Sequence, residues 1–115
     1  MTKEFKEILT NKNILIIGDV MIDAYIWGNV DRISPEAPVP IVSVNKRENR
    51  LGGAANVALN IKALGSTAVL ASVIGNDDKG KEMLDLISAQ QMPTHGLLQS
   101  DKRITTTKFR VIGNN

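Results

Sequence analysis

Short aliphatic runs alternate with runs of helical spacing along most of the chain. Residues 13–18 (Asn-Ile-Leu-Ile-Ile-Gly) are aliphatic and end in glycine, a pattern typical of a parallel strand buried on both faces. Residues 68–74 predict a second buried strand. Residues 54–64 carry apolar side chains at helical spacing, and Gly65 is placed to end that helix. The order of these elements predicts an α/β fold with a parallel sheet.

Two more helices and a third strand are predicted around this unit. Residues 1–13 mix Lys and Glu with apolar residues and indicate a short amphipathic helix. A helix capped by Asn76 or Asp77 is predicted to run to about Gln90, and a short strand is predicted within residues 94–99. The inward side chains of that helix are predicted to be Met83, Leu84 and Ile87.

Three segments have β character outside the predicted parallel sheet. Residues 25–28 and 39–44 have strand composition, and the turn-rich residues 34–38 separate them. Prolines belong at sheet edges, so we predict a short hairpin outside the main sheet that could serve as a lid. Residues 103–112 alternate in character and predict another strand, and residues 113–115 predict a turn in which a hairpin would begin to return.

Composition narrows the class of protein. Fourteen basic and twelve acidic residues give a formal charge of +2, without long runs of one sign, so nothing indicates a nucleic-acid or membrane surface. The chain has no cysteine, which excludes disulfides and thiolate metal sites and fits a cytoplasmic protein. No apolar run reaches membrane-spanning length.

Gly52 and Gly53 stand directly before the central predicted helix. Glycine has no Cβ, so the backbone can adopt positive φ there and a ligand can approach closely. A helix N-terminus also directs N–H groups and a positive dipole toward that ligand, which favours an oxygen-rich or anionic one. Asn56 adds an amide that both donates and accepts hydrogen bonds, as discrimination of sugar hydroxyls requires. The alternative interpretation is a tight loop in which Asn56 caps its own helix.

Asp19 and Asp23 follow the first predicted strand. Ligands of open α/β sheets bind beyond the carboxyl ends of the strands, so both are candidate site residues. Asp23 could accept hydrogen bonds from a polyol, whereas a turn aspartate that binds its own backbone is an equal alternative for Asp19. The only tryptophan, Trp27, and the only histidine, His95, are interpreted as structural.

Residues 75–82, Gly-Asn-Asp-Asp-Lys-Gly-Lys-Glu, nearly match the phosphate-binding pattern Gly-x-x-x-x-Gly-Lys-[Ser/Thr]. Glu82 replaces the hydroxyl that would bind magnesium, and two aspartates inside the loop would repel phosphate. We therefore interpret this segment as a helix cap.

The glycine-rich segments carry a family resemblance. Residues 52–58 (Gly-Gly-Ala-Ala-Asn-Val-Ala), together with the spacing of Gly65 and Gly75, resemble the amino-terminal signature of the ribokinase-like (PfkB) carbohydrate kinases. Residues 75–80 are similar to that family's Gly-x-Asp-x-x-Gly pattern.

Two further motifs are similar to one branch of this family. Residues 18–23 (Gly-Asp-Val-Met-Ile-Asp) and 32–40 (Arg-Ile-Ser-Pro-Glu-Ala-Pro-Val-Pro) resemble the bacterial kinases of D-glycero-β-D-manno-heptose 7-phosphate. The resemblance extends from about Ile14 to the last residue.

The resemblance implies the amino-terminal portion of a ribokinase-like three-layer sandwich, with a small β lid formed by about residues 24–45 and 103–115. It implies a cytoplasmic kinase that transfers the γ-phosphoryl group of ATP, with Mg²⁺, to the anomeric hydroxyl of the heptose phosphate. That reaction lies on the route to ADP-heptose and lipopolysaccharide core. The family's lid often mediates dimerisation, so a homodimer is implied for the complete kinase.

The resemblance also assigns roles to residues. The family's sugar-binding aspartate and Gly-Gly-x-x-Asn turn correspond to Asp23, Gly52, Gly53 and Asn56. Arg110 could contact the substrate phosphate from the lid on charge alone, with a solvated edge charge as the alternative.

One part of the family pattern is missing. The family's catalytic aspartate lies in a Gly-Ala-Gly-Asp turn that also forms the anion hole, and this sequence contains no such turn. We therefore expect residues 1–115 to lack the carboxy-terminal ATP-binding half, to hold no catalytic, cofactor or metal residue, and to be inactive alone. A non-catalytic sugar-phosphate-binding or dimerising fragment, and a kinase for another sugar, remain alternatives. A fused heptose 1-phosphate adenylyltransferase, common in this branch, is not indicated either way.

Overall fold

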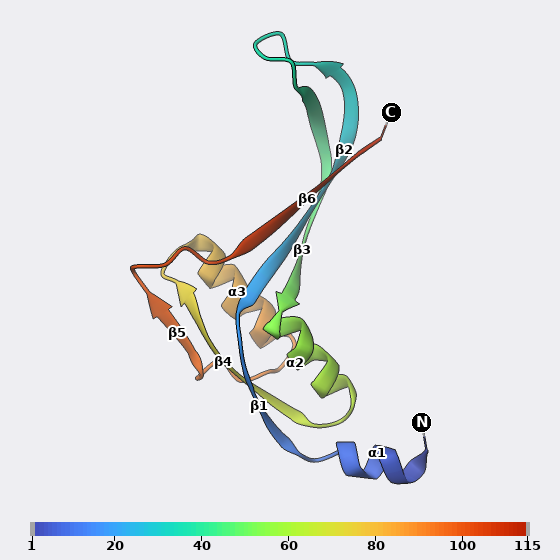
Figure 1. The fold of residues 1–115 in the computed structure, drawn as a ribbon, viewed down its shortest axis with the longest axis vertical. Helices are drawn as coiled ribbons and strands as arrows, with labels where there is room; N and C mark the ends of the chain where they lie inside the picture. Colours follow the sequence, from blue (N-terminus) through green and yellow to red (C-terminus); the bar gives the residue numbers. More distant parts are fainter. Residues whose placement is uncertain (1, 115) are drawn as a thin grey trace.

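The order of helices and strands follows the predicted α/β pattern. The computed structural model describes residues 2–114 and forms two sheets and three helices from them (Figure 1). The helices are α1 (Lys3–Leu9), α2 (Ala54–Ala63) and α3 (Asp78–Ala89). The strands are β1 (Asn13–Ile17), β2 (Val20–Ile33), β3 (Pro40–Gly53), β4 (Thr67–Gly75), β5 (Leu97–Ser100) and β6 (Thr107–Asn114). No helix of residues 2–114 combines the length and apolar character that crossing a membrane requires.

A parallel sheet of three strands, in the order β1-β4-β5, forms the body of the protein. The helices α2 and α3 pack on one face of it, and the core lies between that face and the helices. Its largest fully buried side chains include Leu70 and Ile74 from β4 and Met83 and Ile87 from α3. The predicted inward side of α3 is thus confirmed, with Leu84 packed against the core as a partly buried residue.

The first strand is less buried than its composition predicts. Leu15 and Ile17 of β1 are 59% and 79% exposed, and Leu98 of β5 is 65% exposed. The prediction that β1 is buried on both faces is wrong for the described residues. The helices α2 and α3 cover only one face of the sheet, so side chains that alternate to the other face remain uncovered.

A long hairpin forms the second sheet with β6. The strands β2 and β3 are antiparallel from Val20 opposite Gly53 to Ile33 opposite Pro40, with a register shift between Trp27 and Gly28. The predicted hairpin is confirmed, but it is much longer than its composition indicated. It projects away from the helices (Figure 1), and the molecule measures 60 × 39 × 19 Å.

The strand β6 pairs in parallel with β2, from Ile22 opposite Thr107 to Asn29 opposite Asn114. The turn predicted from residue 113 is therefore wrong for Gly113 and Asn114, because both belong to the strand. The hairpin occupies one edge of β2 and leaves its other edge free to accept β6. Residue 115, the last of the predicted turn, lies outside the described residues.

Candidate functional site

The glycine turn joins the β2–β3 hairpin to the body. Gly53 ends β3 and is the N-cap of α2, with φ 58° and ψ −133°, a backbone conformation that favours glycine. A Cβ at this position would collide with the carbonyl oxygen of Asp19. That same oxygen accepts a hydrogen bond of 2.9 Å from the backbone N–H of Ala54. The predicted positive φ is confirmed at Gly53, and the exposed Asp19 contributes to this turn through its main chain.

Gly52 lies against the carboxylate of Asp23. A Cβ on Gly52 would come within 2.9 Å of Asp23 Oδ2 and of the Met21 side chain. Gly52 needs no left-handed backbone, so its role is to leave space. The two glycines therefore do different things: one makes the turn, and the other accommodates the aspartate.

Asp23 has an oxygen without a hydrogen-bond donor. Its side chain is 17% exposed, and its Oδ1 lies 3.1 Å from Lys108 Nζ on β6. That ion pair lacks hydrogen-bond geometry, and within residues 2–114 no group donates a hydrogen bond to this buried oxygen. A buried acceptor without a donor costs about 1–3 kcal/mol, more if it is charged. The site is therefore suited to an outside donor such as a hydroxyl.

Asn56 lies in the first turn of α2, where its side chain is exposed. The helix has no side-chain cap hydrogen bond, so the alternative in which Asn56 caps its own helix is not supported. Asn56 borders a shallow cavity of about 340 Å³ between α2, α3 and β3, together with Arg50 and Gln90. The structure brings Asp23, Gly52 and Gly53 together, but no hydrogen bond among the described residues joins Asn56 to them.

Aromatic rings and cations cover the face of the β2-β3-β6 sheet on which Asp23 lies. The rings of Tyr25 and Trp27 stack with centroids 5.6 Å apart. Lys46 Nζ lies 4.6 Å from the Trp27 ring, and the guanidinium carbons of Arg50 and Arg110 lie 4.2 and 5.5 Å from the Tyr25 ring. These contacts agree with the prediction that Trp27 packs within the hairpin.

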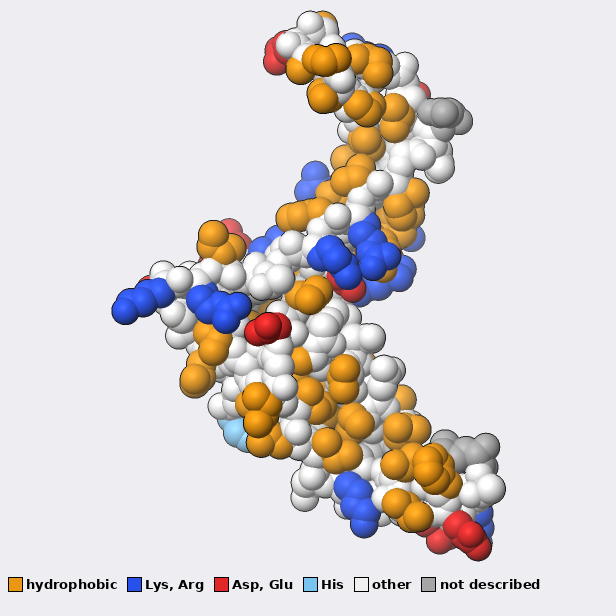
Figure 2. Space-filling view, viewed as in Figure 1, with side chains coloured by type: hydrophobic (Ala, Val, Ile, Leu, Met, Phe, Trp, Pro, Cys, Tyr) orange, Lys and Arg blue, Asp and Glu red, His pale blue; other side chains and the backbone are white. Residues whose placement is uncertain are grey.

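Strand register explains why these cations share one face. Lys108 and Arg50 flank Asp23 on the neighbouring strands, and Arg110 flanks Tyr25. Side chains at directly opposed positions point to the same face of a sheet. We call this surface the cationic face; its basic members are Lys46, Arg50, Lys108 and Arg110. Figure 2 shows Lys and Arg side chains gathered where β6 crosses the hairpin.

Two acidic residues lie among these cations. Asp23 is one, and Glu48, which forms a double hydrogen bond of 3.1 Å with Arg50, is the other. The Arg50 guanidinium lowers the pKa of the Glu48 carboxyl, mainly through this hydrogen bond. Four cations against two carboxylates leave the face with an excess of positive charge. Of these basic residues, the sequence analysis named only Arg110. The alternation of residues 103–112 puts Lys108 on the same side of its strand as Arg110. It does not indicate which strand pairs with this one, so it could not place Lys108 beside Asp23.

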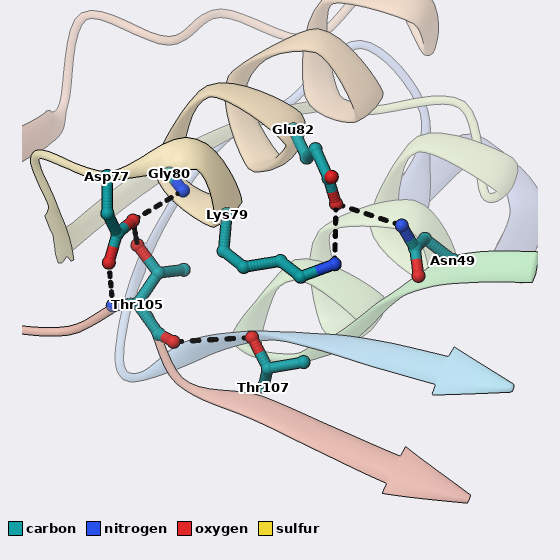
Figure 3. Close-up of polar contacts among 7 residues, drawn as sticks. All are labelled: Asn49, Asp77, Lys79, Gly80, Glu82, Thr105 and Thr107. Carbon is teal, nitrogen blue, oxygen red and sulfur yellow. Dashed lines mark hydrogen bonds and ion pairs between the residues drawn. The ribbon is translucent and has the colours of Figure 1, made fainter. Parts of the chain in front are cut away.

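The loop before α3 is a helix cap. Asp77 Oδ1 accepts hydrogen bonds of 2.7 Å from the Gly80 N–H and from Thr105 Oγ1, and Oδ2 accepts one of 2.9 Å from the Thr105 N–H (Figure 3). Asp77, and not Asn76, is the N-cap. The carboxylate thus occupies the turn where a phosphate cradle would need free N–H groups.

The neighbouring lysine is also engaged. Lys79 Nζ lies 3.0 Å from Glu82 Oε2, which accepts a second hydrogen bond of 2.9 Å from Asn49 of β3 (Figure 3). Residues 2–114 contain no group of three or more acidic, His or Cys side chains placed to hold a metal ion. In this loop the helix cap and the lysine are both engaged by contacts within the protein.

Asp77 should make stability depend on pH on the acid side. Its hydrogen bonds, first that from the Thr105 hydroxyl, lower the pKa of the carboxyl. A lowered folded-state pKa adds stability above the ordinary value, about pH 4, that is lost as the pH falls through the folded-state pKa. In urea unfolding of the protein, the difference in midpoint between wild type and Asp77→Asn should shrink from pH 6 to pH 3. Asp78→Asn removes a neighbouring exposed charge and is the control; an equal shrinkage there would contradict the assignment.

Comparison with known proteins shows one family. Residues 11–115 match the model of the pfkB family of carbohydrate kinases. The chain is 45% identical over 104 residues to the bifunctional protein HldE of Helicobacter pylori, covering 90% of this chain and 23% of that protein. It is 47% identical over 107 residues to the D-β-D-heptose 7-phosphate kinase of Bordetella bronchiseptica, covering 93% of this chain and 34% of that protein.

Solved structures show the same fold. The nucleoside kinase of Methanocaldococcus jannaschii, an archaeal member of the ribokinase family, has a TM-score of 0.66 at 21% identity, covering 91% of this chain and 34% of that one. An uncharacterized sugar kinase of Pyrococcus horikoshii in complex with ATP has a TM-score of 0.61 at 28% identity, covering 84% and 30%. The predicted ribokinase-like α/β fold is confirmed, and the described residues form three parallel strands of it, helices on one face of them and the β2-β3-β6 sheet. The chain spans about a quarter of the bifunctional relative and a third of the others.

Proposed function

Because this chain belongs to the pfkB family of carbohydrate kinases, we propose that residues 1–115 form the sugar-binding and lid portion of a longer kinase. The proposed reaction transfers the γ-phosphoryl group of ATP to the anomeric hydroxyl of D-glycero-β-D-manno-heptose 7-phosphate. The proposed lid segments are residues 24–45 and 103–115. Relatives at 45% and 47% identity, whose names are HldE and D-β-D-heptose 7-phosphate kinase, support this substrate.

The buried oxygen of Asp23 that has an ion pair but no hydrogen-bond donor carries the proposal for the sugar site. Asp23 Oδ1 is buried without a hydrogen-bond donor, and a sugar hydroxyl would supply one. Gly52 and Gly53 leave the backbone open for a ligand to approach beside it. Asn56, at the helix N-terminus, adds an amide for a second hydroxyl. These four residues are the proposed sugar-binding set.

The cationic face supports a phosphorylated sugar over a neutral one. Arg110 and Lys46 have no carboxylate within ion-pair distance among the described residues, whereas Arg50 and Lys108 are paired. A phosphate on the far end of the sugar would be attracted by this excess charge. We assign the 7-phosphate to this face, with Arg110 as its lid contact.

The remaining parts of the proposed enzyme are assigned to residues beyond this chain. They are the catalytic aspartate with its anion hole, and the sites for ATP and Mg²⁺. The proposal includes a cytoplasmic protein whose reaction lies on the route to ADP-heptose and lipopolysaccharide core. It also includes a homodimer formed through the lid, supported by the exposed Ile33, Val39 and Val44 near its tip, where Figure 2 shows apolar side chains.

The test compares the full-length polypeptide with residues 1–115 alone. The full-length protein should phosphorylate heptose 7-phosphate with ATP, and with ribose or fructose kcat/KM should be at least about 100-fold lower because the phosphate contacts are missing. Residues 1–115 should show no ATP-dependent phosphorylation, since phosphoryl transfer needs positioned charge that they lack. Phosphorylation by residues 1–115, or equal rates with a neutral sugar, would overturn the respective part of the proposal.

A second function is favoured by one observation. The cationic face and Asp23 form within residues 2–114 alone, so a sugar-phosphate-binding module without catalysis is consistent with them. Such a module would bind heptose 7-phosphate saturably in calorimetry with no effect of ATP. A full-length protein that phosphorylates the sugar excludes it.

A further inference from the structure

We propose that Asp77 and Thr105 are positioning residues that set the register of β6 on β2 and so place Lys108 beside Asp23. The inference rests on the proposed function only for the role of Asp23 in binding sugar. Figure 3 shows the two residues at the point where the chain leaves the body for the lid, between the first turn of α3 and β6. Neither residue touches the proposed sugar site, so each acts through the strand that it holds.

Two hydrogen bonds join Asp77 and Thr105. Thr105 gives both its N–H and its hydroxyl to the two oxygens of the Asp77 carboxylate, at 2.9 and 2.7 Å. The Thr105 hydroxyl also accepts a hydrogen bond of 2.9 Å from the Gly75 N–H. Thr105 is only 3% exposed, so these bonds are shielded from competing water. One side chain thereby ties the end of β4 and the start of α3 to the chain that enters β6.

The glycines of the Gly-x-Asp-x-x-Gly motif make this contact possible. A Cβ on Gly75 would come within 2.6 Å of Asp77 Oδ2 and 2.8 Å of the Thr105 nitrogen. A Cβ on Gly80 would come within 3.1 Å of Thr105 Oγ1 and would also collide with the Gly75 carbonyl. The motif therefore leaves room for Thr105 rather than for a phosphate.

The contact between Asp77 and Thr105 fixes the position of the first residues of β6. Thr107 Oγ1 donates a hydrogen bond of 3.3 Å to the Thr105 carbonyl, and the Ile22 N–H donates one of 3.0 Å to the Thr106 carbonyl. Lys108 follows immediately, directly opposite Asp23. A slip of one residue along β2 would turn Lys108 to the other face of the sheet and remove the ion pair. Pinning Thr105 prevents that slip because little free chain remains between it and Lys108.

The test uses Thr105→Val and Thr105→Ser in the full-length polypeptide. Valine has the shape of threonine without its hydroxyl, whereas serine retains the hydroxyl. With Thr105→Val, we expect hydrogen exchange of the β6 amides to accelerate about tenfold relative to those of β4, as the loss of a hydrogen bond of ordinary strength implies. We expect KM for the sugar to rise about tenfold, with KM for ATP unchanged. Thr105→Ser should return both values to within about twofold of wild type.

Two further variants make the test decisive. Asp77→Asn keeps an acceptor for the helix cap but presents an NH₂ group to one donor, so we expect a smaller change of the same kind. Asn76→Ala removes an exposed side-chain bond of 2.8 Å to Asp101 from the same loop and should change neither exchange nor KM. If Thr105→Val fails to fold, Asp77→Asn provides the same readouts.

Either measurement can overturn the proposal. Unchanged β6 exchange in Thr105→Val and Asp77→Asn, or acceleration that is equal in β6 and β4, would show that the contact does not set this register. Faster β6 exchange with an unchanged KM for the sugar would show that the register does not serve the sugar site. A wild-type protein without kinase activity would overturn the proposed function, while the exchange comparison would still decide whether the residues anchor β6.

Discussion

Replacing Asp23 by asparagine is expected to lower kcat/KM of the full-length kinase for its sugar by about 10- to 150-fold. The carboxylate has a buried oxygen without a hydrogen-bond donor, so in the proposed complex a hydroxyl donates to a charged acceptor. Hydrogen bonds to charged groups contribute about 1.5–3 kcal/mol, and every 1.4 kcal/mol is a factor of ten. An amide in the same place accepts more weakly and can present its NH₂ group to the hydroxyl.

Stability should change much less than activity. Asparagine loses the ion pair with Lys108, which is partly exposed, and also the cost of burying a charged acceptor without a hydrogen-bond donor, so the free energy of unfolding should change by less than about 1 kcal/mol. Steady-state kinetics with the sugar varied, together with urea unfolding, measure both effects. Asp85→Asn, at an exposed position of α3, is the matched control. A variant at Asp23 with wild-type kcat/KM, or one that loses activity only because it unfolds, would refute the sugar-binding role.

Gly53→Ala is expected to destabilise the full-length protein by about 3 kcal/mol or more. The backbone at Gly53 has φ 58° and ψ −133°, and holding an L-residue in such a region costs about 1–3 kcal/mol. The new Cβ also collides with the Asp19 carbonyl, whose hydrogen bond to Ala54 begins α2. Relief of that collision requires the turn between β3 and α2 to move, which adds to the strain.

Urea unfolding followed by circular dichroism measures this effect. Gly18→Ala is the matched control, because a Cβ there meets only the Ala54 Cβ at 3.2 Å and its backbone has no positive φ. We expect the control to lose less than about 1 kcal/mol. Equal losses in the two variants would mean that the Gly53 conformation is not a source of strain. A stable Gly53→Ala variant with full activity would also contradict the proposal that the sugar site needs glycine at this position.

Local structure was predicted well where neighbouring residues decide it. The helix α2 with its Gly65 stop, a cap of α3 at Asn76 or Asp77, and the buried side of α3 are confirmed, and the structure selects Asp77 as the cap. Each depends on interactions within a few residues, such as the hydrogen bond that the Asp77 carboxylate accepts from the Gly80 N–H. Strand positions were predicted less well: β5 begins at Leu97 rather than near residue 94, and β6 begins at Thr107 rather than at residue 103.

Non-local structure was predicted poorly. Residues 103–112 were recognised as a strand, but their pairing with β2 in parallel was not, because a β pattern states no partner and no direction. The burial of β1 was overestimated for a related reason. Its aliphatic run describes what the strand can bury, and the elements that pack around it determine what it does bury.

For the candidate site, sequence motifs named the residues, and the tertiary structure decided how they lie relative to one another. Asp23, Gly52, Gly53 and Asn56 came from motifs in the sequence, and their role in binding sugar stays a prediction. The proximity of Asp23 to Gly52 was decided by antiparallel pairing, and the place of Lys108 by the parallel addition of β6. The link between Asp77 and Thr105 joins residues that are 28 positions apart, and no spacing rule finds it.

The sequence by itself determined the family, the α/β order of elements, the glycine that turns the chain and the presence of a polar cap, Asn76 or Asp77, at the start of α3. These follow from backbone preferences and short-range hydrogen bonds, which a few adjacent residues encode. Only the tertiary structure decided which face of the lid is cationic, which aspartate oxygen lacks a donor and which threonine anchors β6. Those features depend on strand register and burial, and both arise from packing between segments that are distant along the chain.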